Sequence, residues 1–174
     1  MPIGIQYLPV KERAIQAVVN KIKTIQRMTG FNFDILSVKR YNNLPLDTPE
    51  EGTVFFYELR TRVDSQLEST HHIAEILPIE IWVHNDDVET PHLTFNLLES
   101  DIKRTLGTHV DDPTHPCPTG AQLWVDWSGS NPQYKTAGKS GKTSGIIRYN
   151  IHYRYLRTDD RLWDSIDNLV RNEE

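Results

Sequence analysis

Two segments, AQLWVDW at 121–127 and IIRYNIHYRYLR at 146–157, decide the fold. Both are rich in Val, Ile, Trp and Tyr and alternate apolar with polar residues, which predicts strands with one buried face. The residues that share the predicted buried side are Ala121, Leu123, Val125 and Trp127 in the first segment and Ile147, Tyr149, Ile151, Tyr153 and Tyr155 in the second. We therefore expect a long β-hairpin that packs this side on the core.

The connection between these strands, 128–145, is eighteen residues long and contains three lysines, four glycines and no acidic residue. Hairpin loops usually have 2 to 5 residues, and much longer loops tend to be functional or disordered. We interpret 128–145 as a flexible basic tip, in which Tyr134, Lys135, Lys139 and Lys142 are candidates for contact with a neighbouring subunit or partner.

Length and composition limit the alternatives. A chain of 174 residues fits one domain, and the net charge of -5 gives no general attraction for nucleic acid. Neither a membrane-spanning apolar run nor a signal peptide is recognisable, and the single cysteine, Cys117, excludes an internal disulfide. We expect a domain that makes no use of a membrane.

The N-terminal half predicts an arm, a helix and two strands. Residues 1–9 contain two prolines and form an extended N-terminal arm in our interpretation, with Ile3, Ile5 and Tyr7 as further candidate contact residues. Apolar residues at three-to-four spacing, including Met28, predict a helix over 10–29 that Gly30 ends. Strands are expected over 31–41 and 53–63, the second with five residues on its buried face: Phe55, Tyr57, Leu59, Thr61 and Val63.

The next strand is expected over 71–84, with Ile73, Leu77, Ile79, Ile81 and Val83 on one face and Glu75 as the exception. Pro78 lacks an amide donor, so this strand should lie at an edge of the sheet or be bulged there.

Two further helices are predicted. Thr90-Pro91 begins one that carries Leu93 among its apolar residues and ends at Gly107, and residues 159–174 form a C-terminal helix and tail with Leu162 and Trp163. The order of elements predicts a single α+β domain over 1–174, with an antiparallel or mixed β-sheet, helices packed on one face and the long β-hairpin.

Motifs for chemistry are incomplete. The hexapeptide Gly138-Lys139-Ser140-Gly141-Lys142-Thr143 lacks the earlier glycine and the following helix of a phosphate-binding loop. The group His109, Asp111, Asp112, His115 and Cys117 has no standard zinc spacing. No Gly-x-Ser-x-Gly motif follows a strand. We therefore expect no catalytic, cofactor-binding or metal-binding residues, no cofactor and no enzyme activity.

With these elements placed, the chain from about Val10 to Thr158 resembles the tail terminator proteins of long-tailed bacteriophages, the minor tail protein U-like family. The likeness lies in the order of elements, in the strand with Leu77-Pro78-Ile79-Glu80-Ile81-Trp82-Val83, and in the closing Ile151-His152-Tyr153-Arg154-Tyr155. The long tip and the segment around Trp163 exceed what a minimal member of that family needs.

The resemblance implies a structural virion protein that assembles in the host cytoplasm and forms a ring, usually of six subunits. Such a ring caps the tail tube and joins it to the head-tail connector or neck protein, so DNA passes through it without sequence-specific binding. Another head-tail connector or a tail completion protein is the nearest alternative. A small enzyme with a non-sequential site, or a nucleic-acid-binding adaptor that uses the lysine tip, are alternatives of a different class.

Overall fold

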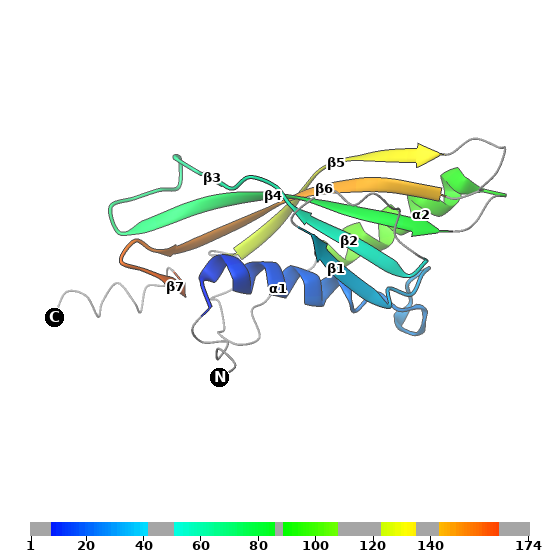
Figure 1. Ribbon diagram of the computed structural model, residues 1–174, viewed down its shortest axis with the longest axis horizontal. Helices are drawn as coiled ribbons and strands as arrows, with labels where there is room; N and C mark the ends of the chain where they lie inside the picture. Colours follow the sequence, from blue (N-terminus) through cyan, green and yellow to red (C-terminus); the bar gives the residue numbers. More distant parts are fainter. Residues whose placement is uncertain (1–7, 42–50, 86–88, 108–122, 135–142, 164–174) are drawn as a thin grey trace.

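The sheet is built around two strands of 14 residues, β4 (His72–Asn85) and β6 (Thr143–Leu156), which pair antiparallel along their whole length. At about 3.3 Å per residue, such strands extend for about 46 Å. The strand order is β1-β2-β4-β6-β5, with β1 (Ser37–Tyr41), β2 (Thr53–Glu58) and β5 (Leu123–Tyr134). The short strands β3 (Arg62–Val63) and β7 (Asp159–Trp163) pair with β4 and β6 (Figure 1). Among the strands that the structure describes, only β1 and β2 run parallel, so the sheet is mixed.

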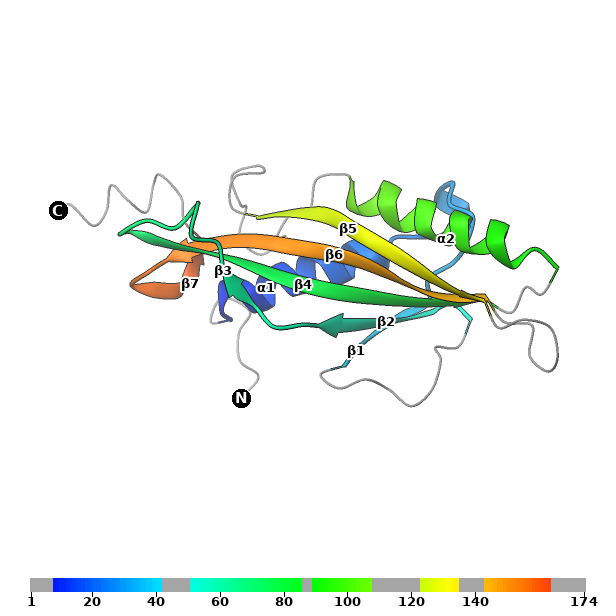
Figure 2. The same ribbon diagram turned by 90° about the horizontal axis from the view of Figure 1, so that it is seen from above.

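This computed structural model describes residues 8–41, 51–85, 89–107, 123–134 and 143–163. Two α-helices, α1 (Val10–Ile22) and α2 (Pro91–Leu106), lie on the same face of the sheet (Figure 2). Their apolar residues form one core with the facing side chains of β2, β4, β5 and β6. The predicted α+β domain with a mixed sheet and helices on one face is confirmed.

The first helix is shorter than predicted. It ends at Ile22, and a separate 3-10 turn, η2 (Arg27–Thr29), follows. Gly30 has φ 86°, in the left-handed region, and therefore ends η2 and not α1. Met28 is 96% exposed, so its three-to-four spacing with the helix does not reflect burial.

The next two strands also differ from the prediction. The first begins at Ser37, and the second breaks after Glu58. Phe55 and Tyr57 of β2 are buried as predicted, but they lie on the face opposite the helices. Val54 and Phe56 join the core beneath the helices, so both faces of β2 are buried and the predicted solvated face is not found there. Leu59 and Val63 are exposed. Apolar residues at consecutive positions hide the period of two on which the prediction depended.

The face predicted for β4 is confirmed for its four residues from Leu77 to Val83, and Ile81 is fully buried. Pro78, however, lies in a central strand and pairs with Asn150 without a register shift. Its carbonyl oxygen accepts the Leu59 amide at 2.9 Å, so its missing N–H faces the interruption between β2 and β3. The strand beside β4 is interrupted between β2 and β3, at the point where Pro78 has no N–H to donate. The sheet accommodates the proline by this interruption and not by the predicted edge position or bulge.

The bounds of α2 follow the prediction, with Pro91 as its first residue. Leu93, by contrast, is 55% exposed, and Phe95 takes the buried position in that turn. Thr90 makes no side-chain capping bond, and Gly107 keeps a right-handed conformation. The helix thus ends at Gly107 without the left-handed cap that is common at such glycines.

The hairpin is confirmed, but both of its strands are longer than predicted, because β5 continues to Tyr134 and β6 begins at Thr143. Residues 128–134 and 143–145 are therefore strand, not a flexible tip, and 135–142 lie outside the described residues. Asp159–Trp163 form β7 in place of the first turns of the predicted C-terminal helix, and 164–174 are outside the description. Arg13 of α1 donates from Nη1 to the Arg161 carbonyl of β7 at 2.8 Å.

Candidate interaction surface

Most of the predicted contact residues lie outside the described part of the chain, namely Ile3, Ile5, Tyr7, Lys135, Lys139 and Lys142. Tyr134 is the last residue of β5 and pairs with Thr143 of β6. The two strands thus bring the described residues on either side of the lysine segment 135–142 opposite each other.

The β5 strand carries a bulge in its middle. The pairing with β6 shifts register between Trp127 and Gly129, and Gly129 has φ 141°, which a residue with a side chain rarely adopts. Bulges bend a strand and increase its twist. Here the bulge directly follows Trp127, whose side chain remains 48% exposed.

The indole of Trp127 is held by α2. The Nζ atom of Lys103 lies 3.8 Å from the centre of its ring, a cation–π contact, and also pairs with Oε1 of Glu99 at 2.8 Å. These contacts restrict the indole without covering it. The β5 edge therefore presents an aromatic side chain accompanied by a cation.

A pocket of about 290 Å³ lies between α2, the segment before β1, and the adjoining ends of β2 and β4. The apolar part of its lining comes from Phe33, Val54, Val83 and Leu98. Leu36 also lines it and is 80% exposed. Its charged lining residues are Arg27, Asp34 and Glu51. It thus combines an apolar interior with mixed charges.

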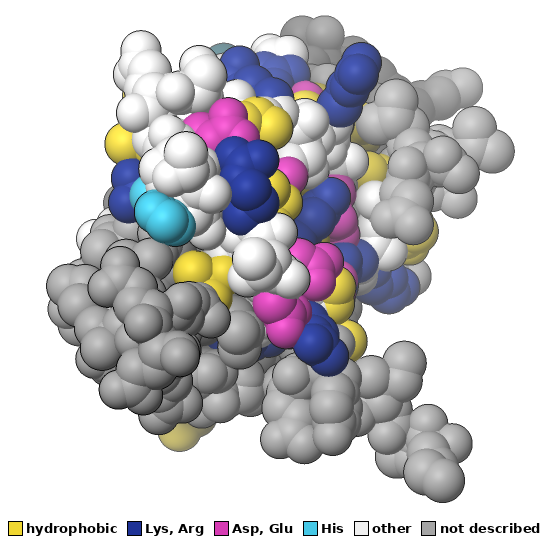
Figure 3. All heavy atoms as spheres, turned by 90° about the vertical axis from the view of Figure 1, so that its left-hand side faces the viewer, with side chains coloured by type: hydrophobic (Ala, Val, Ile, Leu, Met, Phe, Trp, Pro, Cys, Tyr) yellow, Lys and Arg dark blue, Asp and Glu magenta, His cyan; other side chains and the backbone are white. Residues whose placement is uncertain are grey.

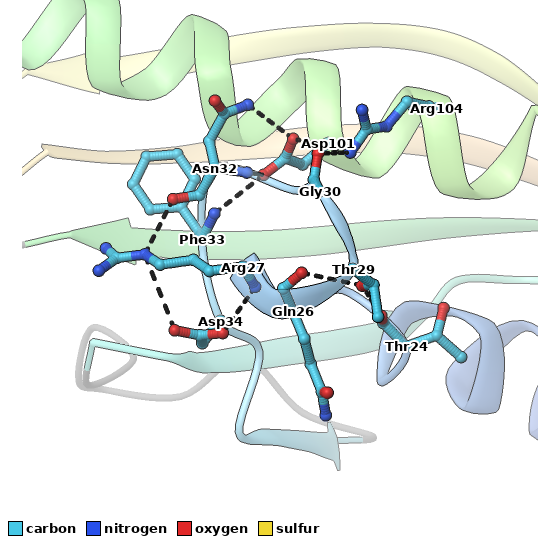
Figure 4. A network of polar contacts seen from close by, with 10 residues as sticks. All are labelled: Thr24, Gln26, Arg27, Thr29, Gly30, Asn32, Phe33, Asp34, Asp101 and Arg104. Atoms are coloured by element: carbon cyan, nitrogen blue, oxygen red, sulfur yellow. Dashed lines mark hydrogen bonds and ion pairs between the residues drawn. The ribbon is translucent and has the colours of Figure 1, made fainter.

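One wall of this pocket is fixed to α2 by a buried carboxylate (Figure 4). Asp101 accepts hydrogen bonds from the amides of Asn32 and Phe33, at 2.8 and 3.1 Å, and from Nδ2 of Asn32 at 2.8 Å. Arg104 stacks on Phe31 at 4.0 Å and donates to the Gly30 carbonyl at 2.6 Å. Residues 30–33 are therefore held in one conformation before any partner binds.

The same segment is closed internally. The Arg27 amide donates to Oδ1 of Asp34 at 2.8 Å, and its Nε donates to the Asn32 carbonyl at 3.0 Å. Leu36 packs against the backbone at Gly52, where an added Cβ would lie 3.1 Å from its Cγ. The exposed side chain of Leu36 therefore packs on the backbone at Gly52.

The face of the sheet opposite the helices carries aromatic and charged side chains. Tyr57 lies between Tyr41 and Trp82, with ring centres 5.7 and 5.3 Å away. Burial raises the pKa of Tyr57, and the nearby Tyr41 and Glu80 raise it further. Glu80 also accepts from Nε of Arg148 at 2.9 Å, which joins β4 to β6 on this face.

A second group on this face lies on β5 and β6. The rings of Trp124 and His152 stack with centres 4.7 Å apart, and Nε2 of His152 contacts the Asp126 carboxylate. Asn150 donates to the other oxygen of Asp126 at 3.1 Å. These partners are cross-strand neighbours, a common means of stabilising a solvated sheet face.

The end of the sheet that carries β3 and β7 has basic and acidic side chains side by side (Figure 3). Arg157 pairs with Glu68 at 2.7 Å, and Arg161 pairs with Asp159 at 2.6 Å. Exposed pairs of this kind contribute little stability, about 0 to 1 kcal/mol each. This end is therefore a mixed-charge surface and differs from the β5 edge with its exposed aromatic group.

The candidate chemical motifs fall almost entirely outside the described residues. Positions 109–117 and 138–142 belong to the undescribed segments, and Thr143 begins β6. Within the described ranges, no three His, Cys, Asp or Glu side chains gather as a metal site, and no helix is long and apolar enough to cross a membrane.

No protein-family model matches the sequence, and no curated protein matches it either. Functional inference therefore depends on the sequence pattern and on the geometry of the surface.

Sequence reasoning missed the pocket and the role of Trp127, which the alternation predicted on the buried face. One signal was present in each case. Asp101 interrupts the apolar positions of α2 between Leu98 and Ile102, and buried carboxylates need donors from elsewhere in the chain. Ser128-Gly129 directly after Trp127 favours a break in regular pairing at the end of the predicted strand.

Proposed function

We propose that this protein is a tail terminator of a long-tailed bacteriophage, a structural protein whose copies close into a ring of six subunits. The ring caps the tail tube and joins it to the neck. The resemblance in element order and in the closing strands supports this assignment. The α+β fold, with its long hairpin, is compatible with it.

The main structural support for self-assembly is that the two edges of the sheet differ from each other. Among the described strands, β1 pairs only with β2, and β5 pairs only with β6, so both outer strands have a free edge. An exposed apolar side chain lies at each side, Leu36 directly before β1 and Trp127 on β5. Contact between two unlike patches repeats from copy to copy and forms a ring when its rotation closes.

The β5 edge is unsuited to open-ended strand pairing. It contains the bulge after Trp127 and also Pro132, and both features discourage the addition of a further strand. Side-chain contacts with defined geometry are therefore favoured over indefinite growth of the sheet. A closed assembly needs this property, because uncontrolled edge pairing would produce aggregates.

Native mass spectrometry of the full chain over a range of concentrations tests the ring, and negative-stain electron microscopy tests its closure. We expect a discrete hexamer with a central opening. Adding the ring to tail tubes of the same phage should then place density at one tube end. A protein that stays monomeric at high concentration and in the presence of tubes contradicts the proposal, whereas rings that bind only the connector identify a neck protein.

A further inference from the structure

We infer that Trp127 of one copy inserts into the pocket beside Leu36 of the next copy and so sets the direction of assembly. The inference rests on the proposed ring and names the contact that builds it. The partner is a second copy of this chain, and the two surfaces involved are different.

Trp127 has the properties of an interface residue. It is 48% exposed, although Lys103 and the β5 strand hold it in place. Tryptophan is enriched among the residues that dominate binding energy, because its large ring buries much apolar area with few rotatable bonds. A restrained but uncovered indole therefore loses little conformational freedom when it is covered.

The pocket has the size for one side chain. Its volume of about 290 Å³ lies at the lower limit of small-molecule sites, which span about 300–1,000 Å³. Phe33, Val54 and Leu98 provide apolar contacts for the ring. Because Asp101 already holds Asn32 and Phe33, the pocket exists before binding and little reorganisation is needed.

Charge also fits this pairing. Lys103, which pairs with Glu99 of its own helix, would bring its ammonium to a pocket that contains two acidic residues, Asp34 and Glu51, against one basic residue, Arg27. The Arg27 and Asp34 side chains lie 3.7 Å apart and are both accessible, so Asp34 can accept a second cation. Salt should therefore weaken the contact.

The position of the two patches determines the symmetry. Trp127 belongs to an outer strand, and the pocket is formed by α2, the segment before β1, and the ends of β2 and β4. Each subunit then uses its indole on one neighbour and its pocket on the other. Such a contact is heterologous, in contrast to a two-fold dimer in which the same patch meets itself.

The test uses two full-length variants, each blocked on one side. Trp127→Asp removes the indole and keeps the pocket, whereas Leu36→Asp places a carboxylate at the pocket and keeps the indole. Native mass spectrometry should show each variant alone as a monomer. A one-to-one mixture should give a heterodimer, because one intact indole meets one intact pocket, and isotope labelling of one variant verifies its composition.

Val63→Asp is the matched control, because Val63 is 51% exposed at the opposite end of the sheet. It should form rings like the parent, and Trp127→Phe should retain them in part. Circular dichroism and thermal melting check that each variant is folded. As a second measurement on otherwise unchanged protein, a photo-crosslinking phenylalanine analogue at position 127 should link to residues 33–36 or 51–54 of a neighbouring copy.

The outcomes separate the two proposals. A parent protein that never oligomerises overturns the ring and this contact together. Rings that persist in both folded variants, with crosslinks elsewhere, overturn only the Trp127 contact. Homodimers of either single variant would show a two-fold interface and overturn the direction of assembly. If a variant does not fold, the crosslinked residues decide the matter.

Discussion

The hydroxyl of Tyr153 donates a hydrogen bond of 2.5 Å to Oε2 of Glu75, which joins β6 to β4 on the face that the helices cover. The hydroxyl of Tyr155 donates to Oε1 of the same carboxylate at 3.2 Å. Each carboxylate oxygen thus has a donor. This arrangement explains how Glu75 can occupy the apolar side of its strand, since burial of a charged group requires hydrogen-bonding partners.

Replacing Glu75 by Ala should lower the free energy of unfolding by about 1–3 kcal/mol, because the hydroxyl of the fully buried Tyr153 loses its acceptor. Urea unfolding followed by circular dichroism measures the change. Glu68→Ala is the control, since it removes only an exposed pair with Arg157. In a double-mutant cycle, additive effects of Glu75→Ala and Tyr153→Phe would show that the two groups are not coupled.

Stability should decline in alkaline solution. Burial, followed by the charge of Glu75, raises the pKa of Tyr155 to about 12, and burial also raises the pKa values of Tyr149 and Tyr153. The unfolded chain releases phenolic protons near pH 10, about two units earlier than folded Tyr155. The contribution of these tyrosines to the free energy of unfolding should therefore be constant below about pH 10 and fall as the pH rises toward 12.

The measurement compares urea unfolding at about pH 9 and pH 11. Tyr155→Phe should reduce the alkaline loss, because the substituted residue no longer titrates. An equally steep loss in this variant would show that Tyr155 does not contribute to it.

Gly145→Ala should destabilise the core by about 1–3 kcal/mol through overpacking. A Cβ at position 145 would lie only 2.1 Å from Cε2 of Phe95, which packs on β6 from α2. Thermal melting of Gly145→Ala, of Phe95→Leu and of the double variant tests the cause. The alanine should cost less in the protein that already carries Phe95→Leu, and equal cost in both backgrounds would exclude the clash.

Replacing residues 135–142 by Asn-Gly should leave the monomer folded. Tyr134 and Thr143 already pair, so a two-residue turn can close the hairpin. Loss of Lys135, Lys139 and Lys142 should nevertheless weaken ring closure or docking to the tail, which native mass spectrometry and phage infectivity report. If the shortened protein assembles and yields infectious particles as well as the parent at ordinary ionic strength, the lysine segment has no part in assembly.

The sequence predicts the hairpin best where one face is buried and the other is solvated. Ile147, Tyr149 and Ile151 alternate with Arg148 and Asn150, and the structure buries the apolar three. From Ser128 onward the alternation is lost, because Asn131 and Pro132 are both exposed although they belong to a strand. There β5 continues only because its backbone pairs with β6, and a hydrophobic pattern cannot reveal backbone pairing.

The candidate surface was less accessible to sequence reasoning for a similar reason. The exposure of Trp127 depends on the bulge and on α2, and the pocket depends on Asp101 meeting Asn32 across 69 residues. The local signals at Asp101 and at Ser128-Gly129 mark these positions but do not identify their distant partners. The error at Asp159–Trp163 has the same origin, since this segment forms a strand against β6 and receives Arg13 from α1.

The bond between Arg13 and the Arg161 carbonyl spans 148 residues and has a consequence for synthesis on the ribosome. At about 5–20 residues per second, translation needs about 7–30 s to supply β7 after α1 has been made. The apolar side of α1 also packs in a core that includes β6, so this side of the helix stays exposed for almost as long, until β6 has been made. Contacts so distant in sequence slow folding, and the exposed nascent helix is a natural target for chaperones during that interval.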